Sequence, residues 1–118
     1  VAGICISRTA EQQLPRVRAL TEATLELLGE EATIEDADLV VYDGYLGAGY
    51  AKPAALEREA IRLVARQEGI ILDTVYTGKT MGGLIDLIRR GVIARDETIL
   101  FWHTGGLPAI FVHAAALF

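Results

Sequence analysis

The sequence contains a single cysteine and two histidines among its 118 residues. One cysteine cannot form an internal disulfide, and Cys5 lies in an apolar run that is typical of a buried strand. Cysteine usage therefore excludes a disulfide framework and a cysteine-rich zinc site, and it favours a cytoplasmic protein.

Clustered positive charge and long apolar runs are also missing. The eleven lysines and arginines are scattered, and the formal net charge is −5. Proteins that bind nucleic acid need a basic surface, which this sequence does not offer. No apolar run approaches the roughly 20 residues that cross a bilayer. We therefore expect neither nucleic acid nor a membrane as a partner.

Three common site motifs are absent from the sequence: the glycine fingerprint GxGxxG, the phosphate loop GxxxxGK[ST] and the zinc motif HExxH. Neither a dinucleotide site nor a metal site is supported by what remains. We expect no bound metal.

Predicted strands and helices alternate along the chain, and 52% of the residues are hydrophobic. The patterns predict strands over residues 1–7, 38–42, 70–72 and 98–102, and helices over residues 9–28, 54–68, 79–90 and 107–118. This order is typical of a parallel sheet with flanking helices, an α/β fold whose sheet is covered on both faces.

The start of the first helix has two interpretations. Thr9 is a candidate N-cap, but Pro15 would then lie inside the helix at a cost of about 3 kcal/mol. Pro15 in the first turn would instead move the start toward Leu14. The end is clearer, because Gly29 stops the apolar pattern.

Two predicted strands end in polar residues and glycines, at residues 73–79 and 103–106. Tyr76 and Lys79 lie in the first of these segments, and His103 lies in the second. Ligands bind at the carboxyl ends of strands in open parallel sheets, so the two segments are candidate walls of one site. Each is equally consistent with an ordinary turn, and Lys79 is more often a solvated side chain than a nucleophile.

The residues around these two segments resemble those of a known enzyme family. Leu72-Asp73-x-Val75-Tyr76-Thr77-Gly78-Lys79-x-Met81-x-Gly83-Leu84-Ile85-Asp86-Leu87-Ile88-Arg89, followed by Leu100-Phe101-x-His103-Thr104-Gly105-Gly106-x-Pro108-Ala109, resembles the D-cysteine desulfhydrase and 1-aminocyclopropane-1-carboxylate deaminase family. Upstream, Asp43-Gly44-Tyr45-x-Gly47-x-Gly49-Tyr50 with Pro53 is also similar in order and spacing. The resemblance covers essentially the whole chain.

The resemblance implies a fold and a cofactor. Family members are pyridoxal 5′-phosphate (PLP) enzymes of fold type II, the fold of the tryptophan synthase β subunit, and they form homodimers. Residues 1–118 would be the C-terminal portion of the large PLP-binding domain. The Schiff-base lysine and the phosphate loop would lie in an N-terminal part of the same enzyme that this sequence does not include.

The resemblance also implies roles for four residues. Tyr76 would be catalytic and would contact a small amino-acid substrate. Thr77, Thr104 and Gly105 would bind the cofactor, and Thr104 would also contact the substrate. Lys79 would be only the residue that follows the turn.

Two of these positions separate activities within the family. The deaminases have Glu after the tyrosine and Leu after the histidine, whereas this chain has Thr77 and Thr104, as the desulfhydrases do. A neutral hydroxyl makes the cofactor ring a weaker electron sink than a carboxylate would, which suffices for β-elimination of sulfide. The resemblance therefore implies a carbon–sulfur lyase that converts D-cysteine to pyruvate, ammonia and hydrogen sulfide.

Other interpretations stay open on the sequence. L-cysteate sulfo-lyase and 1-aminocyclopropane-1-carboxylate deaminase are the nearest enzymatic alternatives. A free-standing α/β module that binds a small anion or a partner is the non-enzymatic one. Exposed apolar surface and unpaired strand edges would favour part of a larger enzyme, which alone we expect to be inactive.

Overall fold

The computed structural model describes residues 1–117 of the chain, apart from the side chain of Ala116. The chain divides into two compact units, Val1–Leu46 and residues 47–118.

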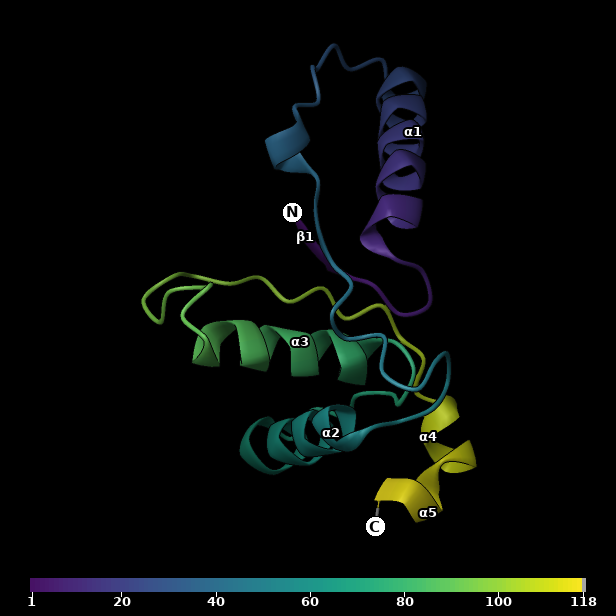
Figure 1. Cartoon of the computed structure of the whole chain (residues 1–118), viewed down its shortest axis with the longest axis vertical. Coiled ribbons are helices and arrows are strands. Elements are labelled where there is room, and N and C mark those ends of the chain that lie inside the picture. Colours follow the sequence, from purple (N-terminus) through teal and green to yellow (C-terminus); the bar gives the residue numbers. More distant parts are fainter. Residues whose placement is uncertain (118) are drawn as a thin grey trace. The chain divides into compact units, whose positions relative to one another are not determined.

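The first unit is built on a two-stranded parallel sheet. Strand β1, Ala2–Ile4, pairs with β2, Val40–Tyr42, in the register Ala2 to Val40. The link between them contains helix α1, Ala10–Leu28, and the short 3-10 helix η1, Asp36–Asp38 (Figure 1). Parallel strands need such a crossover, so the expected parallel pairing is confirmed here.

Helix α1 begins at the earlier of its two predicted starts. The Thr9 side chain accepts the amide of Gln12, and the Gln12 side chain accepts the amide of Thr9, which completes a capping box. Pro15 lies inside the helix, so the alternative start near Leu14 is wrong. The reciprocal cap stabilises the first turn, and Pro15, which lacks an amide proton, removes only one backbone hydrogen bond in the next turn. Gly29 ends the helix in a left-handed conformation, as predicted.

The second unit is centred on two packed helices, α2, Ala55–Glu68, and α3, Thr77–Arg89, which lie side by side in Figure 1. Glycine permits their close approach: a Cβ on Gly82 would lie 2.8 Å from Leu56 Cδ2. A core of Ile61, Val64, Leu72 and Leu117 packs beside them. In α2 the apolar side chain of Leu63 is 40% exposed, whereas the charged side chain of Glu57 is buried.

Two predicted strands are not formed in the second unit. Residues 70–72 and 98–102 are extended but make no ladder within the part of the chain that the structure describes. A strand requires a neighbour with which to exchange hydrogen bonds, and local sequence does not show whether that neighbour is present. The sheet is therefore smaller than predicted.

The C-terminal helix is also shorter than predicted. Two single-turn helices, α4, Ala109–Val112, and α5, Ala114–Leu117, replace the continuous helix over residues 107–118. They are separated at His113, where the backbone leaves helical geometry. Phe118, the end of the prediction, lies outside the described residues. None of the helices within residues 1–117 is both long and apolar enough to span a membrane.

Candidate functional site

The buried carboxylate of Asp73 organises the turn that carries Tyr76. Its Oδ2 accepts the backbone amides of Val75 and Tyr76 at 2.7 and 2.8 Å. Its Oδ1 accepts the amide and the hydroxyl of Thr77, both at 2.6 Å. The Asp73 side chain is 0% exposed. Four donors therefore fix the backbone on both sides of Tyr76 at the N-terminus of α3.

These hydrogen bonds determine the charge of Asp73. Burial alone would raise the pKa of its carboxyl, because desolvation disfavours the ionised form. The hydrogen bonds from the Thr77 side chain and from the amides of Tyr76, Thr77 and Val75 outweigh burial, so the pKa lies below its ordinary value of 3.8. The helix N-terminus adds a favourable dipole. Asp73 is therefore an ionised structural anchor at neutral pH.

The second polar segment, residues 103–106, lies against the same carboxylate. A Cβ on Gly106 would stand 2.7 Å from Asp73 Cγ, so the Gly106 backbone approaches the anchor directly. His103 contacts the segment at residues 70–72, because its Nε2 is 3.1 Å from the Ile71 carbonyl oxygen. Its Nδ1 accepts the Gly105 amide at 3.2 Å. These partners assign the proton to Nε2. The structure thus brings together the two segments that the sequence singled out.

The neighbouring glycines Gly105 and Gly106 offer a matched test of this contact. Both have positive φ, +92° and +90°, but a Cβ on Gly105 would meet nothing within 4 Å. We expect Gly105→Ala to lower the free energy of unfolding by about 1 kcal/mol, the cost of left-handed backbone. Gly106→Ala should cost about 2 kcal/mol more, because the methyl group clashes with a carboxylate that cannot move.

Urea denaturation of the two variants measures the difference. Equal losses for Gly105→Ala and Gly106→Ala would contradict the close contact between Gly106 and Asp73.

Tyr76 projects from this fixed turn with 40% of its surface exposed. Its hydroxyl shares a short hydrogen bond with the hydroxyl of Tyr50, and the two rings meet edge to face, with centroids 6.2 Å apart. The bond to Tyr76 is the largest cause of a raised pKa for the Tyr50 phenol, followed by desolvation and by the negative charges of Tyr76 and Asp73. A paired, accessible phenol can donate or accept a proton at a ligand.

Lys79, the candidate nucleophile in the turn, is engaged elsewhere. Its Nζ lies 2.8 Å from Glu57 Oε1, and the two side chains are 3% and 2% exposed. A buried ammonium paired with a carboxylate is not available to attack a carbonyl. The interpretation of Lys79 as a nucleophile or Schiff-base amine is therefore not supported.

The remaining predicted residues differ in their surroundings. Thr104 is exposed, and Gly105 lies half-buried beside it with open space where a side chain would be. Thr77 is buried, and its hydroxyl donates to Asp73 Oδ1 and accepts the Asp73 amide, which leaves one acceptor lone pair. One further polar atom stands out: Thr74 Oγ1 is buried with no hydrogen-bond partner among the described residues.

Sequence reasoning missed three residues of this site. Tyr50 lies 26 positions before Tyr76 in a glycine-rich loop, and nothing in the sequence around it indicates a contact with Tyr76. Asp73 could have been found, because an aspartate three or four residues before a helix N-terminus is positioned to accept its amides. Glu57 gave no signal, since a glutamate in a first helical turn is usually exposed.

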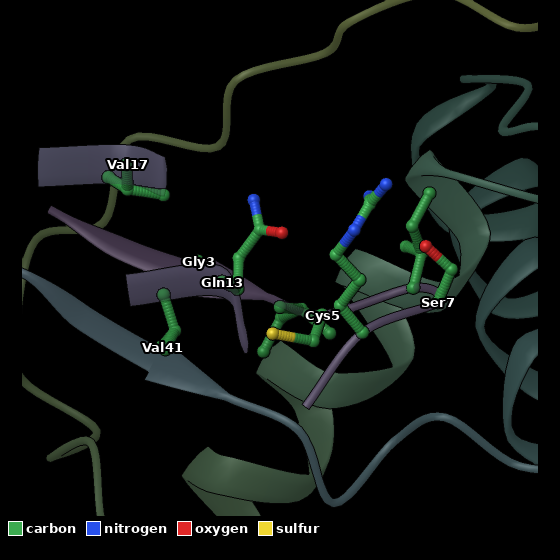
Figure 2. Close-up of a pocket in the computed structure, with 9 residues that line it drawn as sticks. Gly3, Cys5, Ser7, Gln13, Val17 and Val41 are labelled. Atoms are coloured by element: carbon green, nitrogen blue, oxygen red, sulfur yellow. The ribbon is translucent and has the colours of Figure 1, made fainter. Parts of the chain in front are cut away.

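A cavity of about 260 Å³ lies in the first unit (Figure 2). It is lined by residues of β1, the following loop, α1 and β2: Gly3, Ile4, Cys5, Ile6, Ser7, Arg8, Gln13, Val17 and Val41. Burial, and secondarily the charge of Asp43, raises the pKa of the Cys5 thiol, so this cysteine is protonated and unreactive at neutral pH. None of the predicted site residues lines this cavity. No cluster of residues suited to a metal ion occurs within residues 1–117.

Comparison with known proteins identifies the relatives of this chain. No protein-family model matches it. The D-cysteine desulfhydrases of Salmonella typhi and Salmonella newport (strain SL254) are each 43% identical over 111 residues, which cover 94% of this chain and 33% of the relative. The crystal structure of an ACC deaminase homologue superposes with a TM-score of 0.83 at 38% identity, over 98% of this chain and 34% of that one.

The chain thus spans about a third of the length of the curated relatives it matches. The similarity confirms the expected α/β class, a parallel sheet with flanking helices. The matched region is the C-terminal third of the relatives. Over nearly its whole length, the chain is therefore similar to the C-terminal third of D-cysteine desulfhydrases and to part of an ACC deaminase homologue.

Proposed function

We propose that residues 1–118 are the C-terminal portion of a PLP-dependent lyase that converts D-cysteine to pyruvate, ammonia and hydrogen sulfide. The observation that carries the proposal is the similarity of nearly the whole chain to D-cysteine desulfhydrases. The exposed phenol of Tyr76, held on a turn fixed by four hydrogen bonds, supplies a group suited to proton transfer at a substrate.

The described residues fit one wall of a PLP site. Gly105 leaves its backbone open to a planar ring, and Thr104 adds an exposed hydroxyl beside it. Thr77 offers its remaining lone pair at the N-terminus of α3. Lys79 is paired with Glu57 and cannot link covalently to the cofactor. We propose, as the resemblance implies, that the Schiff-base lysine and the phosphate loop belong to an N-terminal part of the enzyme.

We assign the chemistry as follows. Bound PLP supplies an electron-withdrawing ring that stabilises negative charge at the substrate Cα. The Tyr76 hydroxyl donates a proton to the departing sulfur, and Tyr50, hydrogen-bonded to it, orients that hydroxyl. Thr104 would contact both the cofactor and the substrate, and Gly105 would contact the cofactor. The neutral hydroxyl of Thr77, where deaminases have a carboxylate, favours elimination of a good leaving group over cyclopropane opening.

Exposed apolar surface supports membership of a larger protein over a free-standing module. In the second unit Leu100, Trp102 and Phe111 are 84%, 76% and 82% exposed. In the first unit Leu20 and Leu27 on α1 are 70% and 86% exposed. An independent module rarely leaves so many large apolar side chains in water. We propose that the N-terminal part of the same enzyme covers them, in a cytoplasmic homodimer.

The test uses the full-length enzyme, meaning this chain together with the N-terminal two thirds that its relatives carry. With PLP added, we expect sulfide and pyruvate from D-cysteine. L-cysteine, L-cysteate and 1-aminocyclopropane-1-carboxylate serve as competing substrates, the last because the structural neighbour is an ACC deaminase homologue.

L-cysteine would give the same sulfide and pyruvate as D-cysteine and is therefore assayed separately, whereas the other two competing substrates give different products. Sulfite from L-cysteate would move the assignment to the sulfo-lyase, and 2-oxobutanoate from 1-aminocyclopropane-1-carboxylate would move it to the deaminase. Absence of product from all four substrates, with cofactor absorbance present, would refute the proposed reaction while leaving the cofactor assignment intact.

A further inference from the structure

A buried ion pair joins helices α2 and α3 of the second unit. Lys79 Nζ and Glu57 Oε1 are 2.8 Å apart, and both side chains are almost completely buried. Removing two charges from water costs free energy, and the attraction between the charges seldom exceeds that cost. A protein with an apolar pair of similar volume at these positions would often be as stable. A role other than stability is therefore worth seeking for Glu57 and Lys79.

The pair contacts both ends of the loop that carries Tyr50. At the far end, the second oxygen of Glu57, Oε2, accepts the amide of Ala54 at 3.0 Å, which fixes the start of α2. At the near end, a Cβ on Gly47 would lie 3.8 Å from Lys79 Nζ, so the loop begins over the ammonium group. The segment between these two contacts contains Tyr50.

The same pair is also connected to the turn that carries Tyr76 through the backbone, because Lys79 is the third residue of α3 and Tyr76 immediately precedes that helix. The short hydrogen bond between the Tyr50 and Tyr76 hydroxyls connects the loop to the turn at the exposed surface. The buried ion pair provides a second connection between the Tyr50 loop and the Tyr76 turn, in the interior of the unit. It therefore helps to fix the backbone segments that carry the two phenols.

We propose that Glu57 and Lys79 are positioning residues, which hold the Tyr50 loop against the Tyr76 turn so that the two phenol hydroxyls meet. The pair does not contact the substrate. The expected effect of the ion pair on turnover rests on the proposed function, in which Tyr76 transfers a proton. Its expected effect on the hydrogen bond between Tyr50 and Tyr76 does not depend on that function. A small displacement of a catalytic group is enough to reduce turnover strongly.

The experiment compares two ion pairs that join the same helices. In the full-length enzyme, Glu57→Gln with Lys79→Met removes the buried pair while keeping side-chain volume and an acceptor for the Ala54 amide. The control, Glu59→Gln with Arg89→Met, removes the exposed pair between α2 and α3, whose charged atoms are 2.6 Å apart with side chains 51% and 54% exposed.

Two measurements follow for both enzymes. The first is kcat and KM for D-cysteine, where we expect kcat of the Glu57→Gln, Lys79→Met enzyme to fall about 100-fold with a smaller change in KM. The second is tyrosine ionisation followed by ultraviolet absorbance, with Tyr50→Phe as the reference that identifies the Tyr50 signal. Loss of the bond to Tyr76 should return the pKa of Tyr50 toward its ordinary value of 10.0.

The control enzyme should match the parent in both measurements. Parent-like tyrosine ionisation or parent-like kcat in the Glu57→Gln, Lys79→Met enzyme would overturn the proposal. If that double variant does not fold, Glu57→Asp replaces it, because it keeps both charges and withdraws the carboxylate by one methylene; the same shifts are expected.

Failure of this inference is distinguishable from failure of the proposed function. A parent enzyme that releases no product from any substrate refutes the proposed reaction, and the ionisation measurement still decides whether the pair positions the tyrosines. A parent enzyme that is active, with buried-pair variants that match it, refutes the positioning role alone.

Discussion

The Tyr76→Phe enzyme is expected to release sulfide and pyruvate from D-cysteine about 1,000 times more slowly than the parent, with PLP still bound. The substitution removes one hydroxyl and leaves the ring and the Asp73-anchored turn in place. A positioned proton donor or acceptor contributes roughly 10²- to 10⁴-fold to a rate, and here that contribution is lost. Steady-state kinetics at saturating D-cysteine, with cofactor absorbance recorded on the same sample, measures both parts of the expectation.

Two other tyrosine variants complete this test. Tyr50→Phe should lower kcat less, by about tenfold, because Tyr76 keeps its hydroxyl and loses only the partner that orients it. Tyr42→Phe, in strand β2, should match the parent. Full turnover in the Tyr76→Phe enzyme would show that the catalytic assignment of Tyr76 is wrong.

The Asp73→Asn enzyme is expected to lose about 3 kcal/mol of unfolding free energy at pH 7. The substitution keeps the size of the side chain but replaces one acceptor oxygen with an NH₂ group. Two of the four donors that point at Asp73 would then face another donor in a buried environment. Unsatisfied buried donors cost about 1–3 kcal/mol each, and relaxation of the turn recovers part of that sum.

The pH dependence of this loss follows from the lowered pKa of Asp73. A carboxyl whose pKa is lower in the folded state stabilises the protein above its unfolded pKa, and this contribution disappears as the pH falls through the folded value. The gap between parent and Asp73→Asn should therefore be constant from pH 7 to about pH 5 and shrink below about pH 4, near the ordinary value of 3.8.

Urea denaturation at several pH values measures this gap. Asp96→Asn, at an exposed aspartate, serves as the matched control and should change stability by less than about 0.5 kcal/mol. A gap that stays the same down to pH 3 would show that the charge of Asp73 does not contribute to folding.

Features of the fold that depend on neighbouring residues in the sequence could be predicted. Thr9, Gly29 and Gly69 mark helix ends because their side chains or conformations act within a few residues of the backbone they cap. The three long helices follow from the same local signals together with apolar periodicity. The effect of Pro15 was misjudged, because its cost was weighed without the reciprocal cap at Thr9, and the helix predicted over residues 107–118 is interrupted at His113.

Features that depend on distant partners could not be predicted in the same way. Residues 70–72 and 98–102 have the composition of strands, but a strand is defined by a neighbour that local pattern does not reveal. The site shows the same limit. Tyr76 was recognised from its place before a helix, whereas Tyr50 and Glu57 belong to the site through contacts with residues more than 20 positions away.

The extended segments at residues 70–72 and 98–102 have a practical consequence for producing this chain. The amide and carbonyl groups of these segments form no backbone ladder within residues 1–117. Ile71 and Leu100, which belong to the two segments, are 46% and 84% exposed. Such an edge is a template on which a second copy can pair, and aggregation grows with concentration. Co-expression with the proposed N-terminal portion is therefore expected to give more soluble material than expression of this chain alone.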